Sequence, residues 1–110
     1  MNKISLEALA REQLRQAANS GSGRAADTVY GGHEKVLRQT VIGLQEGARL
    51  SEHENPGEAT LYVLSGRVRM IVGDETWEAR TGDLLIVPQS RHSLEAAETS
   101  AILLTVAKTP

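Results

Sequence analysis

The chain has 110 residues, with 12 basic and 14 acidic side chains and a formal net charge of −2. This length is typical of a single domain, and the charge balance argues against a basic surface for nucleic acid or an anionic membrane. The absence of cysteine excludes disulfides, thiolate metal ligands and cysteine nucleophiles. Phenylalanine is also absent, and the aromatic residues are two tyrosines and one tryptophan, so we predict a core of aliphatic side chains.

The N-terminal segment, residues 5–18, is expected to be a helix. Ser5 is a favourable N-cap, and Glu7 adds a negative charge in the first turn. Apolar residues recur at helical spacing: Leu6, Leu9, Ala10, Leu14 and Ala17. This stripe is too thin to fold alone, so we expect the helix to dock on the main domain or on a partner subunit. A Ser/Gly-rich joint follows, which divides the chain into helix and joint (1–23) and a β-domain (24–110).

Membrane and export signals are not evident in the sequence. Glu7 and Arg11 interrupt any apolar signal-peptide core. No run approaches the roughly 20 apolar residues that a membrane-spanning helix requires. We therefore expect a soluble, cytoplasmic protein with neither a membrane nor a nucleic acid as partner.

From about residue 36 the pattern is typical of short strands separated by turns. The expected strands are 36–44, 60–64, 67–72, 76–79, 83–87, 91–96 and 101–107. Ser65-Gly66 is a tight hairpin signal between two of them. Regularly spaced short strands indicate an all-β sandwich or barrel. Inward-facing positions are expected to include Val63, Val68, Met70, Leu94 and either Leu84 or Leu85.

Two blocks of the sequence carry a histidine at a defined distance from turn glycines. The first contains Gly47, His53 and Gly66, and the second contains Gly82, Pro88 and His92. Their spacing resembles the two motifs of the cupin superfamily: Gly, five residues, His-x-His, three or four residues, Glu, six residues, Gly; and Gly, five residues, Pro-x-Gly, two residues, His. In the second block the last gap is one residue shorter. The resemblance covers residues 36–107.

The resemblance implies a cupin barrel, a double-stranded β-helix of the jelly-roll type, with a short N-terminal helix before it. In that family the barrel mouth holds a divalent metal on histidines and a carboxylate. Here the implied ligands are His53, His92, Asn55 and Glu58, and the implied metal is Zn, Fe, Mn or Ni.

The first block departs from the family pattern at two ligand positions. Asn55 stands in place of the second histidine, and Ala59 stands at the usual glutamate position, with Glu58 one residue earlier. A slip of one residue on a strand turns a side chain to the opposite face, unless a bulge near Pro56-Gly57 turns Glu58 back.

Three further residues are candidates near the site. Tyr62 and Met70 are expected to contact a substrate, although Tyr62 also suits packing between sheets or at a subunit contact. His33 suits a surface loop or a third metal ligand from the N-terminal arm.

Three functions remain open at this stage. The first is a barrel that binds a small molecule, with or without a divalent metal. The second is a metal-dependent dioxygenase or isomerase acting on a small oxygenated substrate. The third is a non-catalytic structural dimer. No residue is assigned a catalytic role, and we expect a homodimer in which the arm around residues 27–30 reaches the neighbouring subunit.

Overall fold

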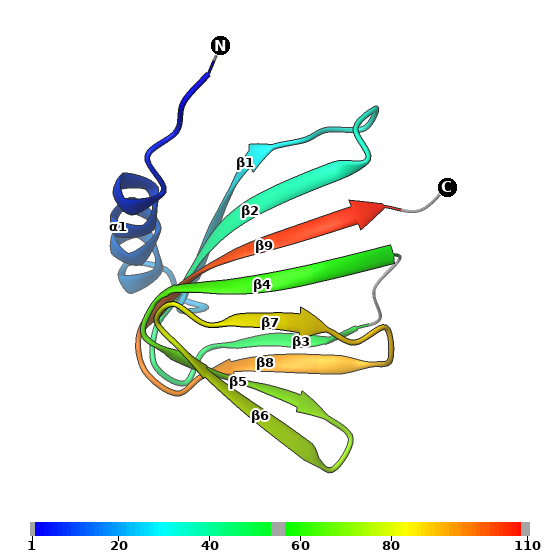
Figure 1. Cartoon of the computed structure of the whole chain (residues 1–110). Coiled ribbons are helices and arrows are strands. Elements are labelled where there is room, and N and C mark those ends of the chain that lie inside the picture. Colours follow the sequence, from blue (N-terminus) through cyan, green and yellow to red (C-terminus); the bar gives the residue numbers. More distant parts are fainter. Residues whose placement is uncertain (1, 54–56, 109–110) are drawn as a thin grey trace.

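The computed structural model describes residues 2–53 and 57–108, without the side chains of Glu52 and His53. The described residues form one helix and nine strands, which lie in two layers (Figure 1). The elements are α1 (Leu6–Ala18), β1 (Arg24–Tyr30), β2 (Leu37–Leu44), β3 (Arg49–His53), β4 (Gly57–Ser65), β5 (Arg67–Val72), β6 (Glu75–Arg80), β7 (Leu84–Val87), β8 (His92–Ala96) and β9 (Ser100–Lys108). The predicted β-rich jelly roll with one N-terminal helix is confirmed.

The strands form two antiparallel sheets packed face to face. The five-stranded sheet has the order β1-β2-β9-β4-β7, and the four-stranded sheet has the order β3-β8-β5-β6. The chain crosses from one sheet to the other at most of its connections, which is the jelly-roll way of building a core from strands distant in sequence. The ribbons of the two sheets lie closest on the left of Figure 1 and spread apart on the right.

The core lies between the two inner faces and is aliphatic, as the composition predicts. The predicted inward positions Val63, Val68, Met70 and Leu94 are all buried. At the ambiguous pair, Leu85 is inside and Leu84 is 57% exposed. Pairing with β4 decides this, because Leu85 lies opposite the core residue Leu61 in the register.

Helix α1 packs on the outer face of the five-stranded sheet. The Ser5 side chain accepts a hydrogen bond from the backbone N–H of Ala8 at 3.2 Å, which is the predicted N-cap. Ala10, Gln13 and Ala17 are buried where the helix packs on the sheet. Within the described part of the chain no helix has the length and apolar character needed to cross a membrane.

Gly43 in β2 allows the helix to approach the sheet closely. A Cβ at this position would lie 2.5 Å from the carbonyl oxygen of Gln13 and 2.9 Å from the backbone nitrogen of Leu14. Both atoms belong to the helix backbone and cannot rotate away as a side chain would. Hydrogen is therefore the only substituent that the observed helix position accommodates.

We predict that Gly43→Ala displaces α1 and lowers the free energy of unfolding by about 1–3 kcal/mol, the usual cost of overpacking. Urea unfolding monitored by circular dichroism measures this loss. Gly21→Ala is the matched control, because a Cβ at Gly21 meets no atom within 4 Å. Equal stability of the two variants would contradict the close approach of helix and sheet.

Candidate functional site

The inner face of the four-stranded sheet has an apolar row running across its four strands. Trp77 on β6 lies opposite Met70 on β5. Met70 lies opposite Leu94 on β8, and Leu94 lies opposite Leu50 on β3. Because directly opposite positions share a face of a sheet, these four positions form one row.

The next row toward the open end of the sandwich carries polar residues. Glu75 on β6 lies opposite Val72 on β5, and His53 on β3 lies opposite His92 on β8. The β5–β8 register pairs Ile71 with Ser93, and continuing it by one residue sets Val72 across from His92. The two histidine positions are distant in sequence but lie side by side in this row. We call the open end of the sandwich the mouth and this row the mouth row.

An irregularity in β3 produces the pairing of the two histidines. Leu50 and His53 are three residues apart, whereas their partners Leu94 and His92 are two apart. One extra residue on β3 is therefore accommodated between them, as in a β-bulge. In a regular strand, positions three residues apart would belong to opposite faces.

Of the two paired histidines, His92 is the one whose side chain the structure describes. It is 3% exposed and shares the inner face with the core residues Leu94 and Ala96. Its Nδ1 lies 2.9 Å from the carbonyl oxygen of Ser90. A carbonyl can only accept, so Nδ1 is the donor and carries the ring proton. In the neutral ring Nε2 then has the lone pair, the arrangement that suits a metal ligand or a hydrogen-bond acceptor.

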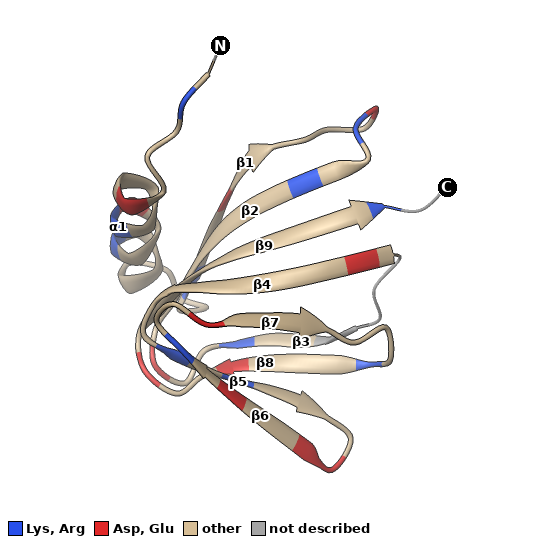
Figure 2. Cartoon of the chain, in the orientation of Figure 1, with Lys and Arg blue, Asp and Glu red and all other residues tan. Residues whose placement is uncertain are grey.

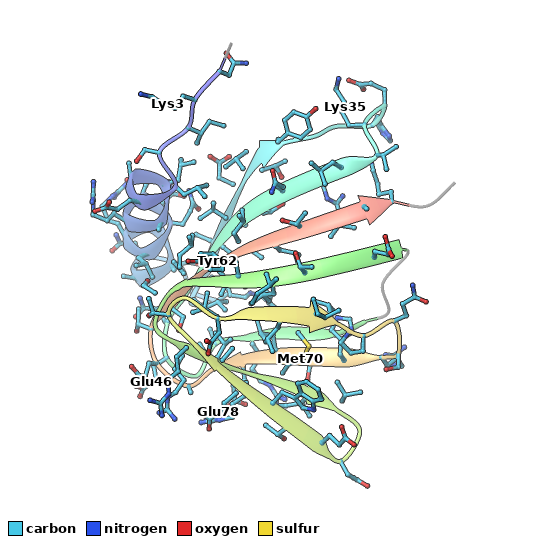
Figure 3. All side chains as sticks on the ribbon, in the orientation of Figure 1. Lys3, Lys35, Glu46, Tyr62, Met70 and Glu78 are labelled. Carbon is cyan, nitrogen blue, oxygen red and sulfur yellow. The ribbon has the colours of Figure 1, made fainter. Side chains whose placement is uncertain are left out.

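An apolar cavity of about 120 Å³ opens beside this row. Its walls come from β5, β6, β7 and the residue after β7, and they are Met70, Val72, Glu75, Trp77, Leu85, Ile86 and Pro88. Met70 lies among the side chains between the two sheets (Figure 3). Met70 thus lines the cavity, and its contact with a ligand stays a prediction.

Trp77 and Glu75 form the most polar wall of the cavity. The indole N–H of Trp77 donates to the carboxylate oxygen Oε2 of Glu75 at 3.3 Å. Trp77 is 60% exposed, although its position is on the inner face. Figure 2 shows the acidic residues of this region at the tip of the β5–β6 hairpin. Water therefore reaches this wall of the cavity.

Two of the predicted site residues lie on the opposite side of the five-stranded sheet. Glu58 is exposed and alternates with the buried Gly57 and Ala59, so it faces outward, and no bulge returns it to the interior. Tyr62 is on the same outer face and is 39% exposed. Neither residue approaches the cavity, because the sheet itself separates them from it.

The remaining candidates are Asn55 and His33. Asn55 lies outside the described residues. His33 is in the β1–β2 connection and lines a shallow surface hollow with Arg38 and Lys108. Within residues 2–53 and 57–108, no three His, Asp or Glu side chains are arranged to hold a metal ion. The metal set can therefore be judged only from His92 and the register position of His53.

Sequence reasoning did not identify Glu75 and Trp77 as site residues. The alternation along the strand already indicates that Glu75 and Trp77 share a face with Ala79. Which face pointed inward depended on the pairing of β6 with β5.

Comparison of the chain with known proteins identifies its family. A cupin domain family model matches residues 40–107, more than half of the chain. The chain therefore belongs to the cupin family. No curated protein matches it.

Several solved structures have the same fold. A conserved protein of unknown function from Streptococcus pyogenes is 27% identical, with a TM-score of 0.73, covering 83% of this chain and 79% of that one. A cupin superfamily protein from Desulfitobacterium hafniense is 16% identical, with a TM-score of 0.71 and 78% of both chains covered. A salicylate 1,2-dioxygenase mutant from Pseudoaminobacter salicylatoxidans is 20% identical, with a TM-score of 0.73, covering 92% of this chain and 32% of that one.

We predict that the neutral imidazole of His92 is the tautomer with its proton on Nδ1, because the Ser90 carbonyl accepts from that atom. The ¹⁵N shifts and two-bond couplings of the ring in long-range ¹H–¹⁵N spectra measure this directly. A spectrum of the Nε2–H tautomer would contradict the assignment.

Proposed function

We propose that this cupin domain binds a small, mainly apolar molecule in the cavity between β5, β6 and β7. The observation that carries the proposal is the cavity itself, with six apolar residues and one carboxylate in its walls. Pockets for small molecules are typically apolar with a few polar groups that orient the ligand. Here Glu75 and Trp77 supply such groups.

The cavity volume limits the size of the bound part. An apolar protein cavity of about 150 Å³ accommodates benzene. The present cavity, at about 120 Å³, suits a group of one small ring or a short branched alkyl chain. Larger ligands would extend past the exposed side chains of Trp77 and Ile86 into solvent.

His92 supplies a polar group next to this cavity. Its position in the mouth row neighbours Val72, which lines the cavity. Since Nδ1 donates to the Ser90 carbonyl, the atom of the neutral ring that can accept a hydrogen bond is Nε2. A ligand hydroxyl is the complementary donor.

Benzyl alcohol is a suitable first probe, and Trp77 is a built-in reporter because it is the only tryptophan of the chain. We expect saturable binding with a blue shift of tryptophan emission, since a ligand in the cavity removes water from the exposed indole. Val72→Phe fills the cavity and should weaken binding about tenfold or more, while Val36→Phe, at a surface position 66% exposed, should not.

Melting temperatures of both variants establish that they are folded. Absence of saturable binding to the wild-type chain, or equal binding by Val72→Phe, would overturn the proposal.

A divalent metal on the two histidines is the second candidate function. The observation that favours it is the His53–His92 register pair, together with the Nδ1–H donor of His92, since metal-binding histidines usually donate their other nitrogen to a carbonyl or carboxylate. A bound divalent ion would supply Lewis acidity at the mouth. The family carboxylate is not reproduced by Glu58, which faces outward. Two imidazoles are fewer ligands than a structural zinc site uses.

Calorimetric titration with Zn²⁺ tests the metal site. We expect one ion per chain, and at least tenfold weaker binding in both His53→Ala and His92→Ala, because even outer-shell changes cost 10–100-fold in affinity. His33→Ala is the control, since His33 is in another part of the fold. Binding that survives loss of either mouth histidine, or that needs His33, would contradict this candidate.

A further inference from the structure

Glu75 is the acidic residue on the inner face of β6, whose other inward positions are apolar. It shares the inner face of β6 with Trp77 and Ala79, and Ala79 is a core residue only 2% exposed. The other six residues that line the cavity are uncharged and apolar. Glu75 is itself exposed, and it is the charged group that a molecule entering the cavity would meet.

The basic side chains of the described residues do not neutralise Glu75. The ion pairs found between described residues have Glu7, Glu12, Glu78, Glu95 and Glu98 as their acidic partners, and Glu75 is not among these. The hydrogen bond that Glu75 accepts comes from the indole of Trp77. This bond holds the carboxylate at the edge of an aromatic ring that is itself open to solvent.

We infer that the cavity is specific for an apolar molecule that carries a cationic amino group, with the ammonium placed between the Glu75 carboxylate and the ring of Trp77. This inference rests on the proposed function. A carboxylate attracts the ammonium directly, and the face of a tryptophan ring is the best aromatic surface for a cation. The apolar part of the ligand then packs against Met70 and Leu85.

Other ligand charges fit this wall less well. An anion in the cavity would face the negative charge of Glu75. A neutral apolar molecule would cover the carboxylate without providing a partner for it, which costs free energy. His92 is two strands away from Glu75, about 10 Å at the usual strand spacing, so it does not compensate the carboxylate.

Three probes with the same ring separate the effect of charge from that of shape. They are benzylamine, which is protonated at neutral pH, benzyl alcohol, which is neutral, and benzoate, which is an anion. Calorimetric titration of the whole chain measures all three without relying on Trp77 emission. We expect benzylamine to bind at least tenfold more tightly than benzyl alcohol, and benzoate to bind most weakly.

Glu75→Gln removes the charge while keeping an oxygen that can accept from the Trp77 indole. It should abolish the preference for benzylamine, because benzylamine loses its charged partner and benzyl alcohol no longer covers an unpartnered carboxylate. Asp74→Asn is the matched control, because it removes one negative charge from the same hairpin turn without belonging to the cavity wall. This variant should keep the preference. Ring chemical shifts of benzyl alcohol bound to each variant verify that the cavity is intact.

The outcomes separate the two proposals. Equal binding of benzylamine and benzyl alcohol, a preference for benzoate, or a preference that survives Glu75→Gln would overturn the inference and leave the proposed function standing. Failure of every probe to bind the wild-type chain would overturn both.

Discussion

Burial of aliphatic side chains between two sheets is the constraint on which the rest of the structure depends. Each Val, Leu or Ile side chain that is fully buried contributes about 1.5–3 kcal/mol relative to exposure. The most completely buried of these include Leu44, Ile102 and Val63, all on the five-stranded sheet. They meet Val68 and Met70 of the other sheet, so the two layers hold each other in place.

The same constraint explains why a cavity exists at one end. No phenylalanine is available, and the single tryptophan lies at the margin, so the interior is filled by shorter side chains. The side chains that line the cavity leave a space of about 120 Å³ between them. The cavity is therefore a consequence of the short side chains at this end of the core. The row that contains Glu75 and His92 lies next to it.

The part of the fold that the sequence predicts is the alternation of inward-facing and outward-facing side chains along a strand. Alternation along β5 correctly placed Val68 and Met70 inside, and the same rule applied to Glu58 indicates the outward position that the structure has. β7 could not be treated in this way, because Leu84-Leu85-Ile86-Val87 is apolar at every position. Only its pairing with β4 determines which residues face inward.

The candidate site was predictable only in part. The two histidine positions were identified from the resemblance of their blocks to the two cupin motifs, and in the structure they are register partners. The irregularity in β3 that produces this pairing depends on β8, a strand some 40 residues away. The sequence of β3 alone therefore does not predict it. The cavity wall formed by Glu75 and Trp77 likewise requires knowledge of the β5–β6 register. The expected subunit contact of the arm around residues 27–30 stays a prediction, while within the chain β1 pairs with β2.

The position of β9 has a consequence for how this protein acquires its structure. β9 lies between β2 and β4 in the five-stranded sheet. Each of these two strands therefore lacks the neighbour on its β9 side until residues 100–108 have been synthesised. During synthesis, which proceeds at about 5–20 residues per second, the earlier strands leave the ribosome before their central partner does. Pairing between distant segments also makes folding slow compared with helical proteins. The nascent chain thus spends its synthesis with apolar strands unpaired, in the period when chaperones can act on it.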